Sequence, residues 1–117
     1  MCHCVDCQRR TGSLFSIAAF FERSAVSVVD GASKTFTRNS VVGKLVTFHF
    51  CPECGSTVFW EPERMPRLIG VAVGAFGDPS FPQPEQSVFT RYKHAWLGLP
   101  GDMPAFATMP PTGSPRS

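Results

Sequence analysis

Residues 44–60 read KLVTFHFCPECGSTVFW, and this stretch decides the fold class. Its first part, residues 44–50, alternates between side chains for the two faces of a strand. A tight turn follows at residues 51–55, and residues 56–60 form an apolar return strand. Two strands joined by so short a connection predict a β-hairpin, with the cysteine-containing knuckle at its tip.

Short apolar runs on both sides of this hairpin predict further strands. They cover residues 13–21, 25–29, 34–37, 68–73 and 87–90. The chain has 11 phenylalanines, 10 glycines and 11 prolines, a composition that favours many short strands joined by turns. No window shows a clear 3.6-residue period, and residues 1–11 are polar and cysteine-rich, which favours a loop. The sequence therefore predicts an all-β domain.

The length of 117 residues fits one small domain, without room for a second core. We expect this domain to span residues 1–109 and the proline- and serine-rich residues 110–117 to form a disordered tail. A net charge of +2 is too weak and dispersed to favour nucleic acid. No apolar run has the length of a membrane span and no leader is evident, so we expect a soluble, cytoplasmic protein without a membrane partner.

The knuckle at the hairpin tip is the strongest local signal for chemistry. Cys51 and Cys54 are separated by two residues, and Gly55 follows them. Two thiolates at this spacing can turn toward one tetrahedral Zn²⁺, and glycine lets the backbone close around the sulfurs. A redox dithiol would be expected in a βαβ context, which this sequence lacks. The pattern therefore favours a metal half-site over a redox pair or a disulfide.

A second cysteine cluster, CHCVDC, begins at Cys2. Cys4 and Cys7 repeat the knuckle spacing, and Cys2 adds a third sulfur. Three protein thiolates and an open fourth position are what a catalytic zinc requires. In the alternative, Cys4 and Cys7 complete the site of Cys51 and Cys54, which gives one structural zinc with four cysteines. The spacing alone favours neither arrangement.

Other polar residues are weaker candidates. His3 can be a metal ligand, a hydrogen-bond donor to a ligand or a solvent-facing residue, and we expect the last; His94 is a lone histidine. His49 lies near the knuckle, where it can support a metal ligand through a hydrogen bond. Arg9 and Arg10 follow the first cluster and are expected to be solvated; in the alternative they hold a carboxylate or thiolate ligand near the metal. The chain carries neither a glycine-rich phosphate loop nor a nucleophile elbow with triad partners.

Several motifs resemble those of one known family. Residues 2–13, CHCVDCQRRTGS, are similar to the central motif of the glutathione-dependent formaldehyde-activating enzyme family, which includes the centromere protein V group. Residues 50–56, FCPECGS, resemble its second motif, and residues 74–79, GAFGDP, resemble its glycine-to-Asp-Pro loop. Residues 82–96 resemble its closing segment, so order and spacing agree over nearly the whole chain.

This resemblance implies a β-tent fold, in which small sheets lie over Cys-ligated Zn²⁺. It implies a catalytic metal site at Cys2, Cys4 and Cys7, and half of a structural site at Cys51 and Cys54. The reaction attributed to the family joins formaldehyde and glutathione into S-hydroxymethylglutathione, formally a carbon–sulfur lyase reaction run in reverse. The implied partner is a small-molecule thiol, glutathione.

The chain departs from the family pattern at its beginning. The family's other two structural ligands form a Cys-x-Cys motif upstream of the central motif, whereas Met1 directly precedes Cys2 here. We therefore expect the knuckle to lack two ligands and the sheet to lack an edge strand. An unpaired strand edge can pair with another copy of the chain, so a homo-oligomer is expected. Gln86 also stands where members often carry histidine. These departures favour the alternative function, a non-catalytic zinc-stabilised binding module or an inactive truncated fragment.

Overall fold

The computed structural model describes residues 1–110, which form two compact units. We call residues 1–18 with residues 80–110 the cysteine unit, and residues 19–79 the sheet unit. The expected tail lies outside the described residues except for Pro110. None of the described helices combines the length and hydrophobicity needed to cross a bilayer.

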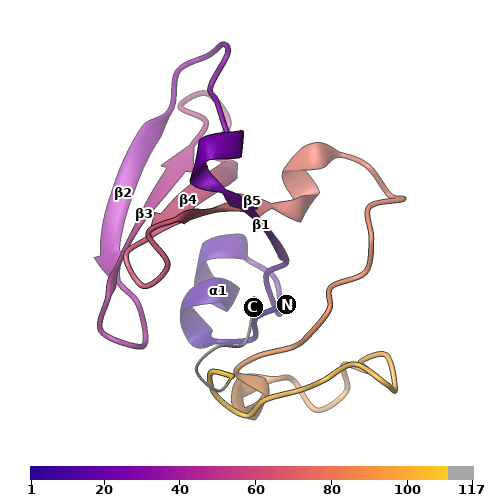
Figure 1. Cartoon of the computed structure of the whole chain (residues 1–117). Coiled ribbons are helices and arrows are strands. Elements are labelled where there is room, and N and C mark those ends of the chain that lie inside the picture. Colours follow the sequence, from indigo (N-terminus) through magenta and orange to yellow (C-terminus); the bar gives the residue numbers. More distant parts are fainter. Residues whose placement is uncertain (111–117) are drawn as a thin grey trace. The chain divides into compact units, whose positions relative to one another are not determined.

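The sheet unit is built on five strands in the order β1-β5-β4-β3-β2 (Figure 1). The strands are β1 (Ala18–Glu22), β2 (Lys34–Asn39), β3 (Leu45–Phe50), β4 (Thr57–Pro62) and β5 (Leu68–Ala72). Pairing is antiparallel between β2 and β3, between β3 and β4, and between β4 and β5. The expected all-β class and the expected hairpin of β3 and β4 are therefore confirmed.

Aromatic residues on one face of this sheet form its buried part. Phe48 of β3 lies opposite Trp60 of β4, with ring centroids 5.7 Å apart, and both side chains are buried. Trp60 in turn lies opposite Gly70 of β5. A Cβ atom on Gly70 would lie only 2.4 Å from Nε1 of the indole, so glycine is required for the ring to pack there.

The structure differs from expectation at three segments. Residues 25–29 form no strand; a 3₁₀ turn, η1 (Arg23–Ala25), follows β1 directly. Residues 87–90 make only isolated bridges and lead into another 3₁₀ turn, η3 (Thr90–Tyr92). The chain start, expected to be a loop, contains the helix α1 (Val5–Thr11). The remaining short element is η2 (Val73–Phe76), which follows β5.

Candidate metal centre

The helix α1 places Cys4 and Cys7 on one side of a single turn. Cys4 is its N-cap, with an extended backbone, and its Sγ accepts a hydrogen bond from the Cys7 N–H at 3.3 Å. The Cys4 carbonyl accepts the first helical hydrogen bond, from Gln8. The helix ends at Gly12, whose φ of 65° is a conformation that glycine adopts without strain. Both ends are thus set by local sequence, and the cap itself is a candidate metal ligand.

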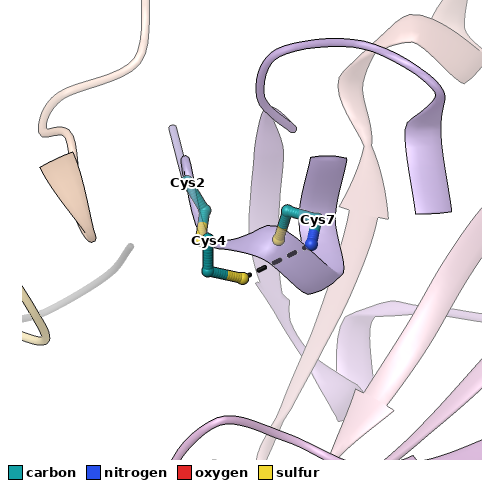
Figure 2. A group of neighbouring side chains, drawn as sticks. All are labelled: Cys2, Cys4 and Cys7. Carbon is teal, nitrogen blue, oxygen red and sulfur yellow. Dashed lines mark hydrogen bonds between the residues drawn. The ribbon is translucent and has the colours of Figure 1, made fainter. Parts of the chain in front are cut away.

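Three sulfurs converge at this turn (Figure 2). The Sγ atoms of Cys2, Cys4 and Cys7 all lie within 4.8 Å of one another. Tetrahedral zinc with Zn–S bonds of about 2.3 Å separates its sulfur ligands by about 3.8 Å, so modest adjustment suffices. In residues 1–110 this is the one group of three or more histidine, cysteine or acidic side chains with such spacing. The donor set fits a thiophilic metal with one ligand position left over.

The three thiols differ in their pKa values. Hydrogen bonds from Cys2 and Cys4 lower the pKa of Cys7, with smaller contributions from Ser16 and the positive charge of Arg10. Hydrogen bonds with Cys4 and Cys7 raise the pKa of Cys2, as does burial. For Cys4 the hydrogen bond from Cys2 lowers the pKa, but the bond to Cys7, burial and the charge of Cys7 outweigh it and raise the pKa. Of the three thiols, Cys7 is therefore the one whose ionised form is favoured.

The chain start that carries Cys2 is hydrogen-bonded on both sides. On one side Cys2 and Ser16 exchange two backbone hydrogen bonds of 2.9 Å each. On the other, the His3 N–H donates to the Val88 carbonyl at 3.1 Å, and the Val88 N–H donates to the Met1 carbonyl at 2.9 Å. Residues 1–3 thus lie between two chain segments, which holds the first sulfur in place.

The expectation that His3 faces solvent is wrong. Its side chain is fully buried, and its Nε2 shares a hydrogen bond of 2.7 Å with Oγ of Ser87, which is also fully buried. Burial lowers the pKa of His3, and the charges of the N-terminus and Lys93 act in the same direction. Nδ1 of this ring is buried without a hydrogen-bond partner, so we assign the proton to Nε2, because an unpaired N–H is more unfavourable than an unpaired lone pair. His3 is therefore a neutral anchor between two metal-ligand candidates.

The Ser87 hydroxyl should be necessary for this anchoring. In Ser87→Ala the imidazole N–H stays buried without an acceptor, which we expect to lower the free energy of unfolding by about 1–3 kcal/mol. We also expect zinc affinity to fall about 10–100-fold, as for groups that orient metal ligands. Denaturant unfolding and chelator competition measure the two effects. Ser13→Ala, at an exposed serine of the same unit, should change neither; equal behaviour of the two variants would contradict the anchoring role.

The remaining polar residues of this unit lie on or beside the helix α1. Gln8 donates from Nε2 to the carbonyls of His3 and Tyr92, at 2.9 and 3.1 Å, and its Oε1 lies 3.3 Å from Nε2 of His94. His94 therefore contacts the helix that carries the cysteines without belonging to the sulfur group. Arg9 is exposed, as expected, whereas Arg10 is only partly exposed and its charge helps to lower the pKa of Cys7. Ser87 and Gln8 were not among the sequence candidates, since single polar residues carry no recognisable spacing.

The second predicted ligand pair, Cys51 and Cys54, lies at the tip of the β3–β4 hairpin. The Gly55 N–H donates to the Cys51 carbonyl at 2.8 Å, and the Cys51 N–H donates to the Ser56 carbonyl at 2.9 Å. Gly55 has a φ of 76°, which closes the turn as expected. Neither cysteine forms a disulfide, and Cys54 is exposed. Hydrogen bonds from Ser56, and a smaller one from Cys51, lower the pKa of Cys54.

His49, considered as a support for these ligands, makes other contacts. Its Nε2 bonds to a carboxylate oxygen of Glu61 at 2.7 Å, and its Nδ1 lies 3.3 Å from Oγ of Ser33. Its ring stacks on Phe59 with centroids 4.1 Å apart. Glu61 also pairs with Arg23 at 2.7 Å, and hydrogen bonds from Arg23 and His49 lower its pKa. This network stabilises the face of the sheet and does not contact the cysteines through the imidazole nitrogens.

An antiparallel sheet and a group of three cysteines that could hold a metal ion define a small β protein with a cysteine-based site. The family model for the glutathione-dependent formaldehyde-activating enzyme matches residues 1–92, and the chain belongs to this family. A protein from Penicillium rubens, named "Putative glutathione-dependent formaldehyde-activating enzyme", is 42% identical over 65 residues. The match covers 54% of this chain and 32% of that protein. The resemblance identified from the cysteine motifs is confirmed.

Proposed function

We propose that this chain holds Zn²⁺ through Cys2, Cys4 and Cys7 and joins a small thiol, glutathione, to formaldehyde as a carbon–sulfur lyase acting in reverse. The observation that carries the proposal is the convergence of three sulfurs, without a fourth protein ligand in the described part of the chain. A closed structural zinc site uses four protein ligands, whereas a catalytic site keeps one position for water or substrate. Membership of the family supports glutathione and formaldehyde as the reactants.

The chemistry needs a nucleophilic sulfur and an electrophilic carbon. A lone pair of the substrate sulfur forms the C–S bond, the π pair of the carbonyl moves to oxygen, and the thiol proton ends on that oxygen. Neither an oxidant nor a second cofactor is needed. When bound, zinc would supply a lowered thiol pKa and a polarised carbonyl.

The contribution of the chain is to position these ligands before the reaction. The Cys7 thiolate offers a preformed anionic ligand, and Cys4 is buried against Val88 and Phe89, which limits access of water on that side. His3 and Ser87 fix the backbone between the first two cysteines. Because these contacts exist without substrate, little reorganisation is required when a thiol arrives.

Cys51 and Cys54 have a structural role in this proposal. Their turn is closed by backbone hydrogen bonds, and they lie on a hairpin outside the cysteine unit. We propose that they ligate a zinc ion that stabilises the hairpin and takes no part in the reaction. This ion would be a structural one, for which four ligands are expected.

Exchange spectroscopy of glutathione with ¹³C-formaldehyde tests the activity by measuring the rate at which adduct and free thiol interconvert. A rate must be measured, because the adduct also forms without a catalyst. Zinc-loaded chain should raise the rate of exchange between adduct and free thiol above the rate with chain treated with chelator. 2-Mercaptoethanol in place of glutathione shows whether the site recognises more than the thiol. If the loaded chain gives no acceleration, the lyase assignment is wrong and the zinc-stabilised binding module becomes the better description.

A further inference from the structure

Trp96 is the most exposed of the phenylalanine, tyrosine and tryptophan side chains in residues 1–110, with 75% of its surface open to solvent. The loop that carries it is nevertheless closed by hydrogen bonds. Nζ of Lys93 donates to the carbonyls of Leu97 at 2.7 Å and His94 at 3.2 Å, and the Leu97 N–H donates to the His94 carbonyl at 3.1 Å. The indole therefore points outward from a hydrogen-bonded loop, and its apolar surface is available to a ligand.

This loop contacts the helix α1 within the cysteine unit. Nε2 of His94 lies 3.3 Å from Oε1 of Gln8, and Nε2 of Gln8 donates to the Tyr92 carbonyl at 3.1 Å. The Gln8 N–H bonds to the Cys4 carbonyl, so Gln8 lies one helical turn, about 6 Å along the axis, from Cys4. The rings of His94 and Trp96 meet at 83°, with centroids 6.4 Å apart. A continuous series of contacts thus leads from the sulfur group to the exposed indole.

A tripeptide thiol has a length suited to this series of contacts. Three extended residues span about 10 Å. A ligand of this length can bind through its central sulfur at the cysteine group and contact the loop of residues 92–97 with one of its ends. 2-Mercaptoethanol, which has only two carbon atoms, is too short to make both contacts.

The charge of the loop favours an acidic ligand. Residues 86–101 contain Arg91 and Lys93 and no acidic residue. The Lys93 ammonium is used inside the loop, whereas Arg91 is exposed, with its guanidinium 5.5 Å from the centroid of the Tyr92 ring. Glutathione has two carboxylates and one ammonium group, so its net charge is negative, whereas 2-mercaptoethanol is neutral. An exposed guanidinium beside an aromatic surface suits a carboxylate of such a peptide.

We propose that Trp96 determines specificity for glutathione, by contacting the peptide part of the thiol while the sulfur binds at Cys2, Cys4 and Cys7. This inference rests on the proposed function and deepens it, because it names how the same site distinguishes glutathione from a small thiol. It does not depend on whether the bound thiol then reacts with formaldehyde.

Protection of Trp96 by S-methylglutathione tests the inference without the reaction, because the methylated sulfur cannot add to formaldehyde. The chain has two tryptophans, of which Trp60 is buried, so acrylamide quenching of fluorescence reports mainly on Trp96. In the zinc-loaded full chain, saturating S-methylglutathione should lower this quenching about twofold as the indole is covered. Absence of protection would overturn the inference.

Two controls identify what covers the indole. Glutarate has two carboxylates without the peptide and should not protect Trp96. Equal protection by glutarate would show that charge alone is recognised and would overturn the inference. Protection that grows with protein concentration in the absence of ligand would place a second copy of the chain on Trp96, and would overturn it as well.

Trp96→Ala measures the contribution of the side chain. We expect its affinity for S-methylglutathione, measured by calorimetry, to be about tenfold lower than that of the wild-type protein. KM for glutathione should rise by about the same factor with kcat unchanged, because the contact with the peptide is the same in ground and transition states. The rate with 2-mercaptoethanol should not change. Phe36→Ala, which removes an exposed ring from the sheet unit, should behave as the wild-type protein in all these measurements.

These measurements separate the inference from the proposed function. Weaker binding by Trp96→Ala, in a chain that gives no acceleration of exchange, would support recognition by Trp96 and contradict the lyase. Acceleration with the same KM in Trp96→Ala and the wild-type protein would keep the lyase and overturn the role of Trp96. The quenching experiment uses the unmodified chain, so it decides the question even if Trp96→Ala does not fold.

Discussion

Replacement of Cys7 by serine is expected to lower the zinc-dependent acceleration of glutathione–formaldehyde exchange about a thousandfold. Hydrogen bonds from Cys2 and Cys4, and the positive charge of Arg10, lower the pKa of Cys7 and favour its ionised form, which is the form that binds zinc. A neutral hydroxyl at this position is a poor zinc ligand. Loss of a Lewis acid removes several kcal/mol of transition-state stabilisation, and about 4 kcal/mol corresponds to this factor.

Cys7→Ser is preferred to Cys4→Ser for this test because Cys4 is almost fully buried in the small apolar core of its unit. A hydroxyl at Cys4 would combine loss of a ligand with loss of stability. Thermal unfolding should therefore show Cys7→Ser close to the wild-type protein without metal, and Ser13→Ala should keep full activity. Retention of more than about a third of the acceleration by Cys7→Ser would exclude this residue as a ligand of the reacting metal.

The hairpin was predictable from the sequence because all its determinants are local. Alternation along β3 specifies a strand, and the Cys-x-x-Cys-Gly turn needs only five consecutive residues. Cys2, Cys4 and Cys7 could be singled out for the same reason, since they lie within six residues. Their spacing alone did not decide between a group of these three and a site shared with Cys51 and Cys54, because that choice depends on contacts between distant parts of the chain.

The helix α1 could not be predicted in the same way. Seven residues make barely two turns, too few for a hydrophobic period to be visible. Its N-cap is a cysteine, whereas serine, threonine, aspartate and asparagine are the residues that usually signal a helix start. The signal at its other end, Gly12 after two arginines, is present in the sequence, but without a usual N-cap residue it does not mark a helix on its own.

The burial of His3 was missed for a different reason. Its partner, Ser87, lies 84 residues away in the sequence, and the pairing of the chain start with residues 87–88 brings the two together. A histidine between two cysteines is a plausible exposed residue until that pairing is known. Long-range contacts of this kind set the surroundings of the three sulfurs, whereas the cysteines themselves are close together in the sequence.

Zinc affinity of the cysteine unit is expected to weaken about a hundredfold for each unit of acidification between pH 8 and pH 6. Zinc binds thiolates, so every ligand that is protonated in the free protein must release a proton. Cys7 is already ionised in this range, since its pKa is lowered to about 2. The pKa values of Cys2 and Cys4 are raised, so both keep their protons. Two protons therefore compete with each metal ion, and each contributes a tenfold change per pH unit.

Competition with a chromophoric chelator measures this slope in the double variant Cys51→Ser/Cys54→Ser, which leaves one type of site. Burial lowers the pKa of the Met1 ammonium, so a chain acetylated at Met1 serves as the control for its proton. A thousandfold slope per pH unit would mean that Cys7 is protonated in the free protein and that the hydrogen-bonded thiolate does not exist. A tenfold slope would mean that one of the other two cysteines is not a ligand. Release of two protons per metal ion is the only result that agrees with three cysteine ligands of which one is already ionised. The pH dependence therefore tests the ligand set and its protonation together.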